Sequence, residues 1–130
     1  VLREGVPEPE LVELYQRSKF LLRFGFGEYG PAMAVIEAMQ NTLPVVINED
    51  LGISDVIREY GAGAVLRDAD PGAAARAVEE LDDERAYMGL QDNIARMRSA
   101  YTWENHVRRL LDPVEPAAGR IAWSRDTYLG

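Results

Sequence analysis

The chain has 130 residues, 47% of them hydrophobic, which is enough for one ordinary domain with a buried core. Its formal net charge of −8 argues against a general nucleic-acid binder and against docking on anionic lipid. The absence of cysteine excludes disulfides and thiol catalysis, and the single histidine, His106, argues against a histidine-based metal site. No apolar run reaches membrane-spanning length, and no signal peptide is recognisable.

Short apolar runs alternate with amphipathic segments along the chain, which predicts a parallel sheet with right-handed crossovers in an α/β, Rossmann-like fold. Asp70 is expected to cap the helix that Pro71 opens, and Ser54 is a candidate cap of another helix. We expect one partial domain over residues 1–112 and a Pro- and Ala-rich tail over residues 113–130. The expected strands are 20–24, 44–47 and 64–66, and the expected helices are about 8–18, 31–41, 54–60, 71–81, 84–100 and 102–111.

A glycine-rich segment follows the first apolar run, and its residues 25–31 have the sequence GFGEYGP. Its three glycines allow the backbone to bend sharply and to approach another molecule closely. Pro31 is favoured at the first position of a helix, and because proline has no N–H, Ala32 and Met33 would be the first free donors. Unpaired N–H groups at a helix start suit a phosphate, so we predict a phosphate-binding turn.

Two carboxylates flank this turn. Glu28 lies in the turn, and Glu37 lies about two turns inside the helix among apolar neighbours, where a buried carboxylate needs a partner. In a functional interpretation, both accept hydrogen bonds from hydroxyls of a sugar or a ribose. In a structural interpretation, Glu28 is a solvated turn residue and Glu37 is the helix's one wet position. The spacing alone favours the structural interpretation, because such patterns are common.

The segment 28–46 resembles the donor-site signature of retaining GT-B glycosyltransferases, most closely the large group 1 family, family 4. That signature is a glutamate, a glycine-rich turn, Glu-Ala-Met and, after a short spacer, Gly-x-Pro-Val. Four further segments resemble motifs of the family in the same order, and the resemblance covers about residues 1–111. These segments are 5–7 (GVP), 51–55 (LGISD), 61–63 (GAG) and 102–103 (TW).

The resemblance implies roles for the residues of the turn and the helix. The loop amides from about Gly30 to Met33 would face the donor diphosphate. Glu28, as the catalytic residue, would hold hydroxyls of the transferred sugar, and Glu37 would bind the ribose of a nucleotide-sugar donor. No metal and no cofactor other than this substrate is implied. The donor-binding residues are then Gly27, Tyr29, Gly30, Pro31, Ala32, Met33 and Glu37.

The sequence departs from the family pattern in three places. The family spaces its two glutamates eight positions apart, whereas Glu28 and Glu37 are nine apart and Tyr29 stands at the expected place. Either a one-residue bulge restores Glu28, or the sugar contact is altered. The family glycine after the Glu-Ala-Met helix is Thr42 here, which affects local backbone geometry. In the segment 51–55, the family glutamate is Asp55 here, which is also a candidate helix-cap residue.

We therefore interpret the chain as the donor-binding part of a retaining hexosyltransferase that transfers a hexose from an NDP-sugar to an acceptor. The parent protein would be the enzyme. This chain alone is expected to be inactive, because the N-terminal acceptor domain, the first half of this domain and the family's phosphate-neutralising Arg and Lys have no counterpart in it. The expected location is cytoplasmic. Contact with a membrane surface through the missing domain is an open alternative.

Two other interpretations stay open at this point. The chain could be a non-catalytic Rossmann-like module for assembly or regulation, to which the position of Tyr29 lends support. It could also be an unrelated nucleotide-binding α/β protein, if the order of the motifs is a coincidence. Neither nucleic acid nor a transmembrane segment enters any of these interpretations.

Overall fold

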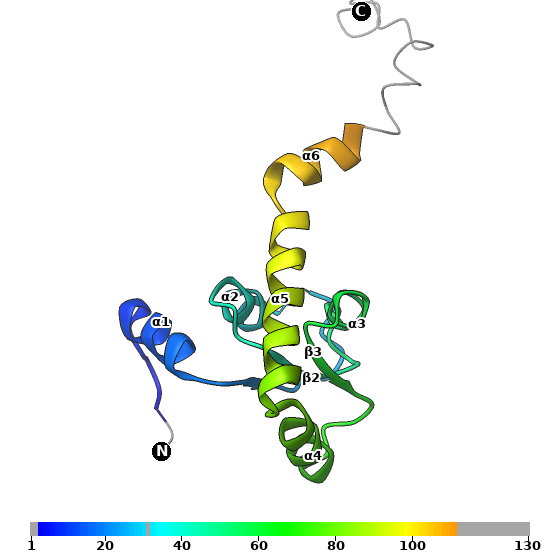
Figure 1. The fold of residues 1–130 in the computed structure, drawn as a ribbon. Coiled ribbons are helices and arrows are strands. Elements are labelled where there is room, and N and C mark those ends of the chain that lie inside the picture. The colour runs from blue at the N-terminus through cyan, green and yellow to red at the C-terminus, as the bar shows by residue number, and fades with distance from the viewer. Residues whose placement is uncertain (1–2, 31, 112–130) are drawn as a thin grey trace, which may run out of the picture. The chain divides into compact units, whose positions relative to one another are not determined.

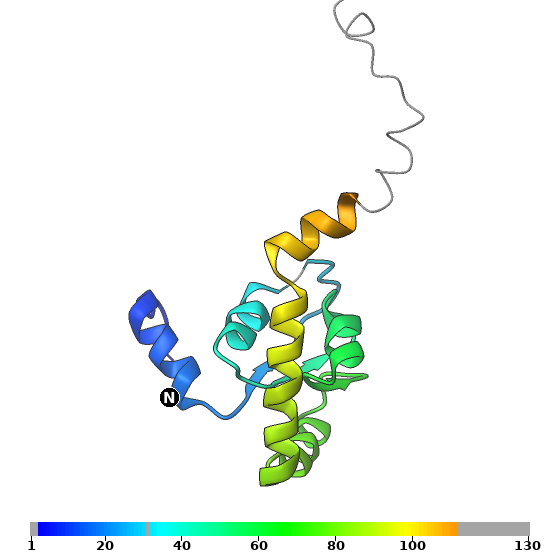
Figure 2. The ribbon, with the colours of Figure 1, turned by 45° about the horizontal axis from the view of Figure 1, so that its top comes forward.

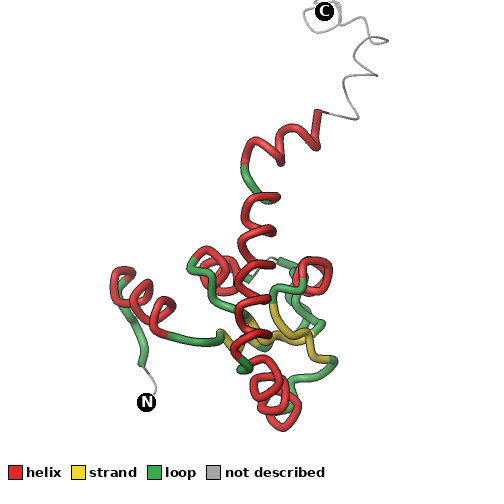
Figure 3. Tube along the Cα trace, in the orientation of Figure 1, coloured by secondary structure: helices red, strands yellow, loops and turns green. Residues whose placement is uncertain are grey.

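The computed structural model describes residues 3–30 and 32–111, with the exception of the side chain of His106. The predictions for Pro31, for His106 and for the tail 113–130 therefore lie outside the described residues. Within the described residues the chain is an α/β structure of three strands and six helices. Figure 3 shows the strands as yellow segments and the helices as red coils along the chain.

The sheet is parallel throughout and has the order β1-β2-β3. Leu21 of β1 pairs with Val45 of β2, which in turn pairs with Gly63 of β3. This arrangement confirms the prediction of a parallel α/β sheet, because each pair of consecutive strands is joined through a helix. The strands are β1 (Leu21–Arg23), β2 (Val45–Asn48) and β3 (Gly63–Leu66).

The helices agree with the sequence pattern to within a few residues, with the largest difference at the start of α2. This helix begins at Met33 rather than at Pro31, and Ala32 before it has a left-handed backbone with φ 47°. The glycine-rich loop is therefore two residues longer than predicted. The helices are α1 (Glu8–Arg17), α2 (Met33–Gln40), α3 (Ser54–Tyr60), α4 (Pro71–Leu81), α5 (Glu84–Ala100) and α6 (Trp103–Leu111).

One of the two predicted helix caps is correct. Asp70 caps α4, because its carboxylate accepts a hydrogen bond from the Ala73 N–H over 2.7 Å. Ser54 does not cap α3. It is the first residue of that helix, Ile53 occupies the cap position, and the Ser54 hydroxyl donates to the Glu49 carbonyl over 3.2 Å. Ser54 thus ties α3 to the loop before it.

The core lies between β2 and the helices α2, α3 and α5. All four residues of β2 are fully buried, as expected for a continuous apolar run covered on both faces. On α5, Leu90, Ile94 and Met97 form a buried stripe at helical spacing. Figures 1 and 2 show α5 running between α2 and α3. The sheet and these helices therefore hold the loops at the strand ends on a packed support.

The chain divides into two compact units between Arg98 and Ser99. In the second unit the Thr102 hydroxyl accepts a hydrogen bond from the Asn105 N–H over 3.2 Å, in the manner of a cap on α6. The domain boundary predicted after residue 112 stays a prediction. Among the residues that the structure describes, no helix is long and apolar enough to cross a bilayer.

Candidate functional site

Two loops meet at the carboxyl edge of the sheet, where ligands of parallel α/β folds bind. The first follows β1 and the second follows β2. They join through a parallel bridge between Glu28 and Leu51, and the Gly52 N–H donates to the Glu28 carbonyl over 2.8 Å. A Cβ atom on Gly52 would lie only 2.5 Å from the Tyr29 carbonyl oxygen, so this close approach requires glycine. The two glycine-containing loops therefore form one connected surface.

Asn48 holds the first loop at its base. Its side chain is fully buried at the end of β2, its Nδ2 donates to the Gly25 carbonyl over 2.7 Å, and its Oδ1 accepts from the Gly25 N–H over 3.0 Å. One amide thus satisfies both backbone groups of Gly25, in the way that a neighbouring strand would. Its Nδ2 also lies 3.4 Å from the carboxylate of Asp50 in the second loop. Asn48 therefore couples both loops to the sheet.

Glu28 is held by an ion pair with Arg23, the last residue of β1. The Arg23 Nη2 donates to Glu28 Oε1 over 2.6 Å, while Nη1 donates to the Phe24 carbonyl. The two side chains are 34% and 38% exposed. A Cβ atom on Gly25 would lie 2.6 Å from Glu28 Oε1, so glycine at that position leaves room for the carboxylate. Glu28 is thus a half-buried, paired carboxylate rather than a freely solvated turn residue.

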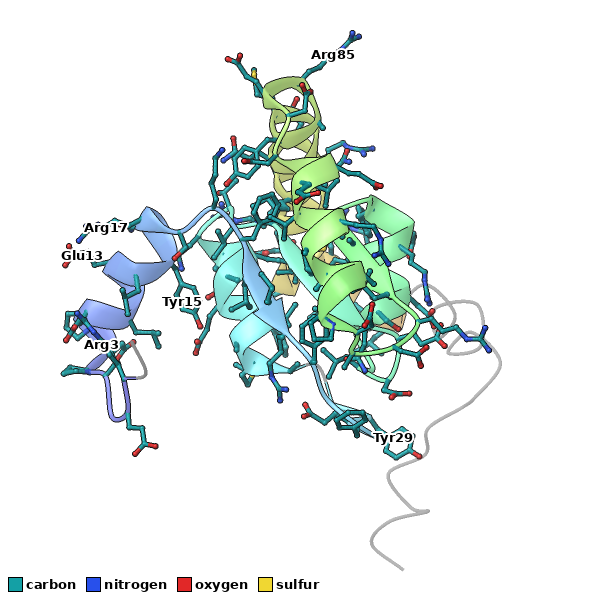
Figure 4. All side chains as sticks on the ribbon, turned by 90° about the horizontal axis from the view of Figure 1, so that it is seen from below. Arg3, Glu13, Tyr15, Arg17, Tyr29 and Arg85 are labelled. Atoms are coloured by element: carbon teal, nitrogen blue, oxygen red, sulfur yellow. The ribbon has the colours of Figure 1, made fainter. Side chains whose placement is uncertain are left out.

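Large side chains of the loop and of the start of α2 are open to solvent. Tyr29 is 97% exposed, Phe26 is 80% exposed and Met33 is 62% exposed. Figure 4 shows Tyr29 at the far end of the loop that follows β1. Gly27 adopts a left-handed backbone with φ 61°, which turns the chain between Phe26 and Glu28. The loop therefore presents its aromatic side chains to solvent while its backbone is fixed from beneath.

The start of α2 offers backbone donors beside this loop. The first bonds back to the cap run from the Val35 and Ile36 N–H groups to the Ala32 carbonyl, and no side chain caps the helix. The N–H groups of Met33 and Ala34 precede these bonds, so they have no partner within the helix. The first turn therefore has the geometry and the partial positive charge that suit an anion.

Glu37 lies one helical turn after Met33 and on the same face of α2. Its side chain is half-buried, and its Oε2 accepts a hydrogen bond from the Tyr15 hydroxyl over 3.0 Å. Burial raises the pKa of Tyr15, and the hydrogen bond and negative charge of Glu37 raise this pKa further. The carboxylate predicted inside an apolar helix therefore has the partner that its burial requires.

Three residues of this site were not singled out by the sequence. They are Asn48, Arg23 and Tyr15, and each acts through a contact with a residue 5 to 23 positions away. Tyr15 carried the signal of an inward-facing helix position, and Asn48 carried the signal of a polar residue that ends a buried strand. Neither signal names the contact partner, because the partner is set by tertiary packing.

No metal centre accompanies these residues. Across the described parts of the chain, no group of three or more His, Cys, Asp or Glu side chains could hold a metal ion. Asp55 is the second residue of α3, so it is not the cap of this helix, a position that Ile53 occupies. Its side chain is 94% exposed and lies 3.5 Å from Arg58. It is therefore a solvated residue of a helix start.

The fold and the connected glycine loops define a Rossmann-like α/β domain with an anion-compatible helix start at its carboxyl edge. Residues 4–97 match the family model of the glycosyl transferases group 1, and the chain belongs to this family. The match includes both loops, all three strands and most of α5. No curated protein and no solved structure gives a significant match.

Proposed function

We propose that this chain is the donor-binding part of a retaining glycosyltransferase of GT-B type and family 4, which transfers a hexose from a nucleotide diphosphate sugar. Membership of the group 1 glycosyltransferases supports transfer of a glycosyl group by the parent protein. The observation that carries the donor assignment is Glu37. It is a half-buried carboxylate on the first helix after the glycine loop, on the same face as the exposed Met33.

In this proposal the backbone N–H groups of Met33 and Ala34 bind the diphosphate, and Glu37 accepts hydrogen bonds from the ribose. Glu28 holds hydroxyls of the transferred sugar through the carboxylate oxygen that Arg23 does not occupy. Gly27, Gly30 and Ala32 shape the turn, and Tyr29 contacts the donor. The two carboxylates need no metal for these roles, because hydroxyl groups donate to them directly.

We further propose that the parent protein contains an acceptor domain and additional strands beside β1, together with basic residues that neutralise the diphosphate. An open edge supports this. Among the described residues β1 pairs only with β2, and Leu22 at its centre is 48% exposed. Stabilisation of the leaving diphosphate is the main electrostatic task in this chemistry. This chain alone should therefore show no turnover with nucleotide sugars, and robust transfer would contradict the proposal.

A thermal-shift panel with UDP, GDP and ADP tests the donor assignment. A nucleotide at ten times its Kd stabilises the folded chain by about 1.4 kcal/mol, which raises the melting temperature by about 4–6 °C. Glu37→Gln should abolish most of this shift. Glu13→Gln is the matched control, because Glu13 is an exposed helical glutamate paired with Arg17 on α1.

A non-catalytic module of the same fold is the second candidate function, and the Arg23–Glu28 ion pair favours it. In such a module Glu28 would serve the loop structure, and the exposed Tyr29 would meet another protein. No response of the wild-type chain to any of the three nucleotides would support this candidate and count against donor binding.

A further inference from the structure

Tyr15 is a buried tyrosine of α1 whose hydroxyl reaches across to α2. Its side chain is 8% exposed and belongs to the hydrophobic core, yet its hydroxyl donates to Glu37 Oε2 over 3.0 Å. Figure 4 shows Tyr15 projecting from α1 toward α2. The two residues are 22 positions apart in the sequence, so the packing of α1 against the core determines where this donor lies.

The chemistry of the pair keeps Tyr15 a hydrogen-bond donor. Burial raises its pKa above the ordinary value of 10.0, and the bond to Glu37 raises it further, so the hydroxyl stays protonated at neutral pH. A glutamate on a helix surface otherwise samples several side-chain rotamers. A donor fixed in the core restricts this sampling, because only some Glu37 rotamers bring Oε2 to the hydroxyl.

The bond leaves most of the carboxylate's acceptor capacity in place. A carboxylate has about four lone-pair sites, and the Tyr15 hydroxyl uses one of them. The backbone of Glu37 is fixed as well, since its carbonyl accepts from the Asn41 N–H over 3.2 Å and from the Asn41 Nδ2 over 2.9 Å. Glu37 is therefore presented as an oriented acceptor, held both at its main chain and at its side-chain end.

We propose that Tyr15 is a positioning residue for ribose recognition. By holding Oε2, it turns the carboxylate of Glu37 so that it accepts from both vicinal hydroxyls of a ribose. This inference rests on the proposed function of Glu37 and extends it to specificity. A site built to bind a hydroxyl discriminates against the analogue that lacks it, because a polar group is then left without its partner. Loss of the positioning hydroxyl should weaken this discrimination.

The test compares Tyr15→Phe with Tyr87→Phe as a matched control. Tyr87→Phe also removes only a hydroxyl, which donates to the Lys19 carbonyl over 3.0 Å, two residues before β1. Each variant is titrated by calorimetry with whichever of UDP, GDP and ADP stabilises the wild-type chain most, and with the 2′-deoxy form of that nucleotide. The readout is the ratio of the two Kd values, which a general loss of stability does not change.

The wild-type chain should prefer the ribonucleotide, and Tyr15→Phe should reduce this preference by about three- to tenfold. Tyr87→Phe should keep the wild-type ratio. An unchanged ratio in Tyr15→Phe, with Glu37→Gln still impaired, would overturn the positioning role and leave the donor site intact. If no nucleotide binds the wild-type chain, the donor assignment itself fails. If Tyr15→Phe does not fold, Tyr15→Met fills the site with a flexible apolar chain and should reduce the ratio in the same way.

Discussion

Replacement of Asn48 by alanine should loosen the glycine loop at its base. Asn48 is fully buried and satisfies both the N–H and the carbonyl of Gly25, so Asn48→Ala leaves two backbone groups without their partner. Each buried group left unsatisfied costs about 1–3 kcal/mol, and water that enters the vacated space offsets part of this. We therefore expect the free energy of unfolding to fall by about 2–4 kcal/mol.

Urea denaturation followed by circular dichroism measures this loss. Asn93→Ala is the control, because the Asn93 side chain lies away from the loop, where its amide donates to the Gly61 carbonyl over 2.9 Å and its Oδ1 accepts from the exposed Arg96 over 2.5 Å. It should cost about 1 kcal/mol. Hydrogen exchange at Gly25 to Gly30 should accelerate in Asn48→Ala only. A loss below about 0.5 kcal/mol in Asn48→Ala, with unchanged exchange in the loop, would refute the claim that Asn48 holds the loop at its base.

Asn48→Asp tests the two hydrogen bonds between Asn48 and Gly25 separately, because it keeps an acceptor and removes the donor. The introduced carboxylate can still accept from the Gly25 N–H, but it faces the Gly25 carbonyl and lies near Asp50. Both neighbours raise the pKa of a buried carboxyl above its unfolded value. A carboxyl whose pKa is higher in the folded than in the unfolded chain contributes its full stability below the unfolded pKa, which is about 4. This contribution is lost as pH rises through the folded pKa. The variant should therefore approach wild-type stability near pH 4 and lose it toward pH 7.

Three further variants or conditions test other parts of the structure. Thr42→Gly should raise the free energy of unfolding by about 0.5–1 kcal/mol in urea denaturation, because Thr42 has a left-handed backbone with φ 59° that glycine adopts without strain. A loss of stability would contradict the claim that the backbone of Thr42 is strained. Arg23→Gln should lower the free energy of unfolding by about 0.5–1 kcal/mol at low salt and by less at 1 M salt, since the ion pair with Glu28 is partly exposed. A loss that does not depend on salt would exclude the ion pair as the cause. Burial raises the pKa values of Tyr15 and Tyr87, so their stabilisation is present below pH 10 and is lost as pH rises through the folded pKa values. Urea denaturation between pH 8 and pH 11 should show this loss. In a double variant with Tyr15→Phe and Tyr87→Phe, the free energy of unfolding should depend less on pH.

The sheet and its crossovers could be predicted because each strand is a short run bounded by helical periodicity. The apolar run 44–47 predicted the buried central strand β2, which spans residues 45–48. The segment 61–63 (GAG) resembled a family motif, and the structure supplies the reason. Gly61 has φ 63° at the end of α3, and a Cβ atom on Gly63 would lie 2.0 Å from the Val45 carbonyl oxygen.

The site could be predicted only in part. Glu28 and Glu37 were recognisable as carboxylates near a glycine turn, but their partners Arg23 and Tyr15 were not, because packing rather than spacing selects them. The start of α2 was misplaced by two residues. A proline favours a helix start in general, but here the left-handed Ala32 delays the helix to Met33. Because the helix begins later, the loop between Glu28 and α2 is longer. The two glutamates Glu28 and Glu37 are also one position further apart than in the family pattern.

The most direct test of the central claim is an NMR titration of the ¹⁵N-labelled chain with UDP, GDP and ADP. Donor binding at the glycine loop and α2 predicts that one of these nucleotides shifts the amide signals of residues 27–30 and 32–37 and leaves α4 largely unaffected. Shifts that are absent with all three nucleotides, or that gather on α4 and α5 instead, would contradict the assignment of Glu37 to a nucleotide site.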